Sequence, residues 1–146
     1  VKFFITIDYK SFDKLFGDSY TNIINLGPVS LKSCPSLYDQ CDALFMPSLL
    51  EVFSASYLEA MKMSKPILSS NLSFAKDICQ DAAVYFDPSD EKDISKKIIK
   101  LSIDKELVLQ LIRNGNKRLD DLETPKSRAQ KYLEIISHLA QKKNKG

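Results

Sequence analysis

Short apolar runs alternate with amphipathic stretches from the start of the chain to Phe86, and this alternation restricts the fold more than any other feature. The apolar runs predict five strands: Val1–Ile7, Asn22–Leu26, Ala43–Met46, Pro66–Ser69 and Ala83–Phe86. Runs this short that are apolar on both faces are typical of parallel strands covered by helices. The stretches between them predict four helices: Ser11–Phe16, Ser36–Gln40, Ser54–Met63 and Ser73–Cys79. The alternation indicates an α/β fold with a doubly wound parallel sheet of about five strands.

After Asp87-Pro88 the strands stop. Three helical stretches follow in series: Asp90–Ser102, Lys105–Asp121 and Pro125–Lys142. In the third, apolar residues recur at helical spacing and predict a packing face: Ala129, Tyr132, Leu133, Ile136, Leu139 and Ala140. We therefore expect one domain over residues 1–122, followed by a C-terminal helix and a lysine-rich tail over residues 123–146.

The composition excludes several classes of function. A net charge of +2 on 146 residues gives no argument for a nucleic-acid partner, and none is expected. The three cysteines, Cys34, Cys41 and Cys79, lack the spacing of metal ligands, and their odd number indicates reduced thiols and a cytoplasmic setting. With His138 as the single histidine, neither a zinc site nor a histidine-based triad can be assembled from this sequence. No signal peptide and no apolar run of membrane-spanning length is present.

Basic residues gather toward the C-terminus. The cluster consists of Lys126, Arg128, Lys131, Lys142, Lys143 and Lys145. A solvated tail is the favoured interpretation, and a patch that faces lipid is the alternative.

The stretch PSLLEVFSASYLEAM, from Pro47 to Met61, carries the strongest functional signal. Glu51 follows a predicted strand, at the rim where ligands of parallel sheets bind. The next helix offers an anion its free N–H groups and positive dipole end, and Glu59 lies in its early turns. Carboxylates beside a phosphate-binding helix suit a nucleotide sugar, because they accept hydrogen bonds from vicinal hydroxyls.

Each glutamate also has an ordinary structural explanation. Ser56-x-x-Glu59 fits a capping box, in which Glu59 satisfies a backbone donor. Glu51 alone could be a surface loop residue. Spacing by itself leaves both alternatives open.

Three segments in order resemble the C-terminal half of the retaining GT-B glycosyltransferases of group 1, family 4. They are PSLLEVFSASYLEAM, then KPILSSN, then DAAVYFDPSDEKDI. The resemblance covers about residues 1–120. It implies half of a GT-B fold, namely the Rossmann-like domain that binds the donor nucleotide.

The resemblance also implies residue roles. Glu51 is the candidate catalytic residue, and in the family this glutamate contacts hydroxyls of the transferred sugar. Glu59 matches the glutamate that holds the ribose. The remaining candidate substrate-binding residues are Phe53, Ser54 and Ala55 at the diphosphate, and Gly27 and Val29 at the base.

The reaction implied is transfer of a sugar from a nucleotide-diphosphate sugar to an acceptor hydroxyl with retention, in synthesis of cell-surface polysaccharide or glycolipid. No cofactor and no metal are expected. The partners implied are the nucleotide sugar donor and an N-terminal acceptor domain of the same full-length chain. The location implied is the cytoplasm, and peripheral association with the inner face of the membrane is left open. The 146-residue chain alone is expected to be inactive.

The sequence departs from the family pattern in two places. Ser73-Phe74 stands where many members carry a Gly-Gly pair, and Val52 and Ser54 stand where members carry glycines. A side chain there narrows the approach of the backbone to phosphate. The alternative function is therefore a degenerate, non-catalytic nucleotide-binding or assembly module.

The alignment makes Val1–Ile7 the second strand of the donor domain, with the first strand absent. Unpaired strand edges are costly in a buried sheet. We therefore expect Val1–Ile7 to pair directly with Ala43–Met46, which gives the order NIINL, VKFFITI, ALFM, PILS, AVYF.

Overall fold

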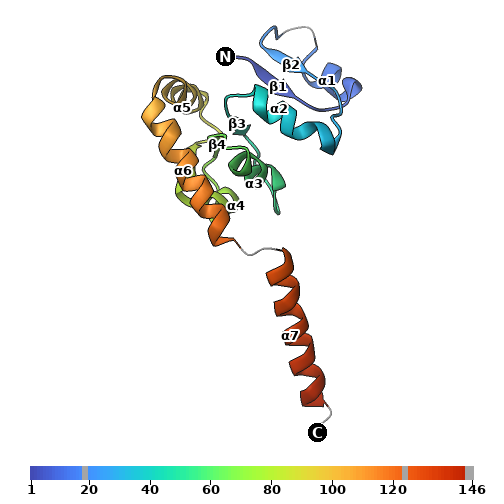
Figure 1. Cartoon of the computed structure of the whole chain (residues 1–146). Helices are drawn as coiled ribbons and strands as arrows, with labels where there is room; N and C mark the ends of the chain where they lie inside the picture. Colours follow the sequence, from blue (N-terminus) through green and yellow to red (C-terminus); the bar gives the residue numbers. More distant parts are fainter. Residues whose placement is uncertain (18–19, 123–124, 144–146) are drawn as a thin grey trace. The chain divides into compact units, whose positions relative to one another are not determined.

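The computed structural model describes residues 1–17, 20–122 and 125–143 (Figure 1). The chain divides into two compact units, Val1–Cys41 and Asp42–Gly146, and each is described by itself. Residues 123–124, where the predicted C-terminal segment begins, and residues 144–146, which include Lys145 of the basic cluster, lie outside the described residues.

The first unit holds a two-stranded parallel sheet. Its elements are β1 (Phe3–Ile5), α1 (Tyr9–Leu15), β2 (Ile23–Asn25), the 3-10 turn η1 (Leu31–Ser33) and α2 (Cys34–Gln40). Phe3 of β1 lies opposite Ile23 of β2. Asp8 caps α1, since its side chain accepts a hydrogen bond from the backbone N–H of Ser11, and the hydrogen bonds from Ser11 lower the pKa of Asp8.

The second unit holds a three-stranded parallel sheet in the order β3-β4-β5. Its elements are β3 (Leu44–Met46), α3 (Ala55–Lys62), β4 (Ile67–Ser70), α4 (Ser73–Cys79), η2 (Gln80–Ala82), β5 (Ala83–Phe86), α5 (Glu91–Ile103), α6 (Lys105–Asp121) and α7 (Pro125–Lys143). Every predicted strand and helix is present, with ends shifted by a few residues. The predicted α/β fold with parallel strands is confirmed.

One face of the three-stranded sheet packs against α5 and α6. Leu68 and Phe86 of the sheet form a buried cluster with Leu101 and Leu111 of these helices. Phe86 also stacks on Phe45 of β3, with ring centroids 5.3 Å apart. Asp90 begins α5 as predicted, because its side chain accepts hydrogen bonds from the N–H groups of its first turn.

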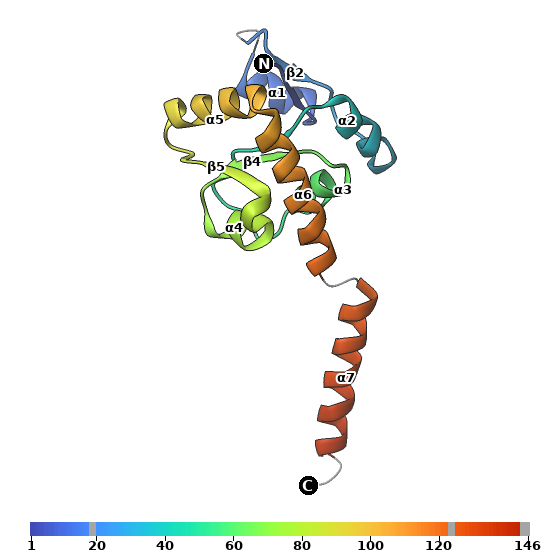
Figure 2. The same ribbon diagram turned by 60° about the vertical axis from the view of Figure 1, so that its left-hand side comes forward.

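The opposite face of this sheet lies against α3 and α4. Side chains alternate between faces along a strand, so Ser69 points away from Leu68, and it forms a hydrogen bond with Tyr57 of α3. The helix α6 packs beside α3 and beside η2, which follows α4 (Figure 2). Arg118 of α6 fixes this arrangement by donating to the backbone oxygens of Asp77 and Ile78 at the end of α4. Helices therefore cover both faces, as a doubly wound fold requires.

The predicted pairing of Val1–Ile7 with Ala43–Met46 is wrong. Among the described residues, hydrogen-bonded ladders join β1 to β2 and β3 to β4 and β5, and β1 is an edge strand. The prediction used the apolar character of both strands and their order in the family. Apolar patterning identifies a strand, but it does not identify the strand with which it pairs.

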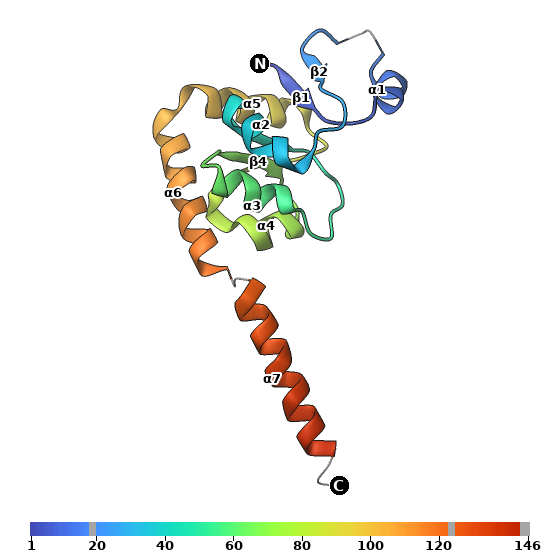
Figure 3. The ribbon, with the colours of Figure 1, turned by 45° about the vertical axis from the view of Figure 1, so that its right-hand side comes forward.

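The predicted packing face of the last helix is exposed. Its larger apolar side chains, Tyr132, Leu133, Ile136 and Leu139, have exposed fractions of 58–61%. Figure 3 shows α7 as one continuous helix. Apolar periodicity shows that a helix has an apolar face, and it does not identify what that face contacts. Within the described part of the chain, no helix has the length and hydropathy needed to cross a bilayer.

Cys79 at the end of α4 gives a test of this packing. It is fully buried, and burial raises its pKa to about 12. We expect iodoacetamide to alkylate it at least about 100-fold more slowly than Cys34 or Cys41 in the native protein, because the thiolate is the reactive form. Mass spectrometry of tryptic peptides over time measures the rates. In urea the three rates should become similar, and equal rates without urea would contradict the burial of Cys79.

Candidate functional site

The loop over residues 47–54 joins the carboxyl end of β3 to the start of α3 and carries Glu51. The Ser48 hydroxyl donates to Glu51 Oε1 at 3.2 Å, which holds the carboxylate against its own loop. Glu51 is half-buried. Apolar side chains beside it are exposed, and Val52 has an exposed fraction of 99%. The loop therefore lies at the strand rim, where the sequence predicted a ligand.

The start of α3 is suited to an anion. Ser54 is the N-cap residue with φ −107° and ψ 118°, yet its side chain makes no capping hydrogen bond. The first N–H groups of a helix have no acceptor within the helix. The Ser54 hydroxyl does not fill that role, and amides at the start of a helix are groups that bind phosphate oxygens.

Glu59 lies in the second turn of α3 and is half-buried. The capping-box interpretation needs Ser56 at the N-cap position, but α3 begins at Ala55 and its N-cap is Ser54. That interpretation is wrong, because the backbone has already entered the helix before Ser56. The two glutamates thus flank the start of one helix, with Glu51 in the loop before it and Glu59 inside it.

The two departures from the family's glycines do not strain the backbone. Among the described residues other than glycine, positive φ angles occur at Ser64 and Gln80, not at Val52 or Ser54. Glycine's conformational freedom is therefore not needed at either position. The Val52 side chain extends into solvent, and the Ser54 side chain is buried.

A buried polar network lies beneath the loop. Tyr57 of α3 is fully buried, and its hydroxyl lies 2.8 Å from the Ser69 hydroxyl at the end of β4. Both Ser69 and Ser70 donate to the backbone oxygen of Met46, each over 3.4 Å. Burial is the main cause that raises the pKa of Tyr57, and the charge of Glu51 adds to the rise. Sequence reasoning missed this network, although two serines ending an apolar strand were a signal.

The predicted base-contacting loop belongs to the first unit. Gly27 has φ +70°, and a Cβ placed there would lie 2.8 Å from the Tyr9 hydroxyl oxygen, so glycine is required. Asn25 holds this loop to the end of β1, because its Oδ1 accepts from the N–H groups of Ile7 and Gly27. Val29 is half-buried. Neither Asn25 nor Tyr9 was predicted from sequence.

Five of the predicted site residues therefore share one loop and helix start: Glu51, Phe53, Ser54, Ala55 and Glu59. Gly27 and Val29 share a loop of the other unit. The role of each residue toward a ligand stays a prediction.

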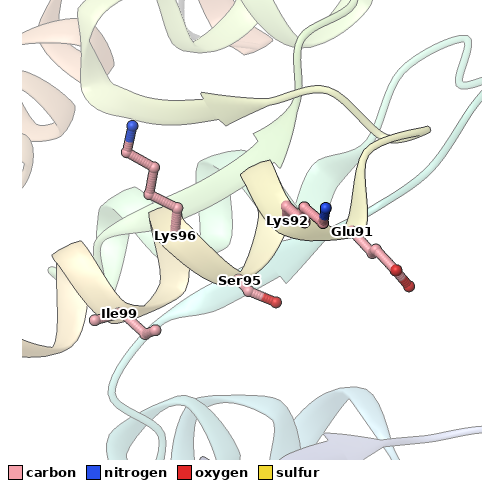
Figure 4. Close-up of a pocket in the computed structure, with 5 residues that line it drawn as sticks. All are labelled: Glu91, Lys92, Ser95, Lys96 and Ile99. Atoms are coloured by element: carbon pink, nitrogen blue, oxygen red, sulfur yellow. The ribbon is translucent and has the colours of Figure 1, made fainter.

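A hollow of about 510 Å³ lies elsewhere, on the surface of α5 (Figure 4). Its lining consists of residues from this helix: Glu91, Lys92, Ser95, Lys96 and Ile99. It includes none of the predicted site residues. Within residues 1–17, 20–122 and 125–143, no group of three or more His, Cys, Asp and Glu side chains could hold a metal ion.

The parallel strands, the loop after β3 and the helix it enters define an α/β domain. Residues 20–118 match the family described as glycosyl transferases group 1. The chain belongs to this family.

Similar proteins cover different shares of the chain. The O-antigen chain mannosyltransferase B of Escherichia coli is 34% identical over 74 residues, which are 51% of this chain and 19% of the relative. The chain thus spans about a fifth of the length of that curated relative.

Solved structures share the fold at low sequence identity. Sucrose-phosphate synthase from Thermosynechococcus elongatus has a TM-score of 0.75 and 15% identity, covering 94% of this chain and 38% of that one. The crystal structure of TarM has a TM-score of 0.75 and 16% identity, covering 92% and 28%. A glycosyltransferase from Rickettsia africae ESF-5 has a TM-score of 0.70 and 17% identity, covering 90% and 35%.

Proposed function

We propose that this chain is the donor-binding part of a glycosyltransferase whose donor is a nucleotide-diphosphate sugar. The observation that supports it most directly is the loop before α3, where Glu51 and Glu59 flank a helix start that Ser54 does not cap with its side chain. The amides at this helix start bind the diphosphate. Carboxylates on either side bind the hydroxyl groups of the sugar and the ribose.

The proposed reaction transfers the sugar to an acceptor hydroxyl with retention at the anomeric carbon. Glu51, placed at the strand rim, contacts the transferred sugar. The amides of α3 stabilise negative charge that develops on the leaving diphosphate, which is where electrostatic stabilisation lowers the barrier most. No metal ion takes part in the proposed reaction.

The proposed setting is the cytoplasm, with peripheral association at the inner face of the membrane, in synthesis of a cell-surface polysaccharide or glycolipid. The similarity to an O-antigen mannosyltransferase supports this pathway. An N-terminal acceptor domain of the same full-length chain supplies the other half of the reaction site.

The alternative of a degenerate module without catalysis drew its support from Val52 and Ser54. The negative φ at Ser54 and the outward direction of the Val52 side chain favour the transferase, because both leave the backbone free to approach phosphate.

Glu59→Ala tests the proposal. We expect it to weaken binding of a nucleoside diphosphate by about 1–3 kcal/mol, the loss of a hydrogen bond to a charged acceptor. Calorimetry with UDP and GDP measures the change. The matched control is Glu106→Ala, an exposed glutamate in the first turn of α6. Equal affinities in the wild type and both variants would remove Glu59 from the site.

A further inference from the structure

We propose that Tyr57 and Ser69 are positioning residues, which fix the loop carrying Glu51 and thereby set how tightly the sugar part of the donor is held. The inference rests on the proposed function and deepens it. It assigns a role to side chains that touch no ligand.

The hydroxyl of Ser69 connects the two ends of the loop. At the first end it donates to the backbone oxygen of Met46, the last residue of β3. At the other end it lies 2.8 Å from the hydroxyl of Tyr57 on α3. A serine hydroxyl has one proton. Since that proton goes to Met46, the Tyr57 hydroxyl donates to Ser69, and the donors form one chain from α3 through β4 to β3.

The two side chains of this hydrogen-bond series are buried away from water. Tyr57 and Ser69 each have an exposed fraction of 0%. A buried hydroxyl that loses its partner is costly, so these groups resist separation. Ser70 adds a second donor to the same Met46 oxygen. The strand end is therefore held more firmly than a backbone ladder alone would hold it.

The loop between these anchors faces solvent over much of its length. The side chains of Leu49, Leu50, Val52 and Phe53 are exposed. Within the loop, the Ser48 hydroxyl donates a hydrogen bond to Glu51. The separation of Met46 and Tyr57 therefore sets the conformation in which Glu51 meets a sugar.

The test compares Tyr57→Phe with Tyr85→Phe. Tyr85 lies on β5, and its hydroxyl donates to the Gln80 oxygen at 2.6 Å, so this control also removes one tyrosine hydrogen bond. The first measurement is the backbone amide order parameter of residues 48–54 by NMR without ligand. We expect it to fall in Tyr57→Phe and to stay unchanged in Tyr85→Phe.

The second measurement separates sugar binding from nucleotide binding. Calorimetry gives the affinity for UDP-glucose relative to UDP and for GDP-mannose relative to GDP. We expect Tyr57→Phe to lower this ratio about fivefold for the accepted donor, and to change nucleotide affinity less than about twofold. Tyr85→Phe should change neither.

A double variant distinguishes positioning from simple stability. Tyr57→Phe with Ser69→Ala removes both hydroxyls. The Met46 oxygen keeps the Ser70 donor, so no buried polar group loses its last partner, and we expect the double variant to match the wild type in thermal stability. The sugar-to-nucleotide ratio should stay low. Recovery of the ratio together with stability would overturn the proposal, as would order parameters that are unchanged in Tyr57→Phe or fall equally in Tyr85→Phe. If Tyr57→Phe and Ser69→Ala each fail to fold, while the double variant binds the donor as the wild type does, the proposal is also overturned.

The proposed function and the positioning role can fail independently in these experiments. If the wild type binds none of the four compounds, donor binding is contradicted. The order parameters then decide alone whether the Tyr57–Ser69 pair fixes the loop.

Discussion

The 146-residue chain is expected to transfer no sugar to an acceptor above the uncatalysed rate, even where it binds the donor. It spans 19% of the curated relative and 28–38% of the structures that share its fold. Holding a second reactant in place lowers the activation free energy of a bimolecular reaction by about 7–11 kcal/mol. Without an acceptor domain this contribution is missing, and water has access to the donor.

A radiolabelled donor incubated with the chain and a mixture of sugar acceptors measures transfer, with separation of products by chromatography. The positive control is the proposed longer protein, in which an N-terminal acceptor domain is joined to this chain. Glu51→Ala should abolish transfer in that longer protein, whereas Glu106→Ala should not. Turnover by the 146-residue chain that Glu51→Ala abolishes would show that the whole reaction site lies within it.

Much of the fold follows from the sequence because its causes are local. The strands of the second unit are apolar on both faces, and the structure buries every residue of β4. Helix ends could be predicted where a side chain determines them, as at Asp90. The predicted helix Ser54–Met63 also begins close to the observed start of α3, where Ser54 is the N-cap residue although its side chain makes no capping hydrogen bond.

The pairing of strands could not be predicted in the same way. Which strands meet depends on the helices that cover them, and these are distant in sequence. The argument that β1 must pair with β3 compared two apolar segments and omitted the helices. The apolar periodicity of α7 likewise identified a face without identifying its contacts.

In the candidate site too, residues close in sequence could be predicted and contacts between distant residues could not. Glu51, Ser54 and Glu59 are close in sequence, so their common motif predicted their common location. The Tyr57–Ser69 pair joins residues separated by twelve positions across two elements, and its partner Met46 lies on a third. Two serines at the end of an apolar strand signal buried polar groups, but no local pattern identifies their partners on other elements.

Phe86→Ala is expected to destabilise the second unit by about 3–5 kcal/mol, the usual cost of removing a buried aromatic ring. Phe86 has an exposed fraction of 1%, and it packs on Phe45 and the helices α5 and α6. Its backbone oxygen also accepts a hydrogen bond from Asn71 N–H, just after Ser70. Loss of this ring therefore weakens the strand that holds the carboxyl end of β3. Urea denaturation followed by circular dichroism measures the change.

Phe53→Ala is the matched control, because the same ring is removed from a side chain that is 58% exposed in the loop. We expect it to change stability by less than about 0.5 kcal/mol. Typical domains have only about 5–15 kcal/mol of stability, so Phe86→Ala leaves little folding free energy. Phe86→Leu gives a smaller loss that can be measured. Equal losses for Phe53→Ala and Phe86→Ala would contradict the placement of the core between β5 and α5. If only Phe86→Ala is costly, the stability of this unit depends on apolar contacts buried at the sheet. The same sheet supports Met46, so the loop that carries Glu51 is attached to the most stable part of its unit.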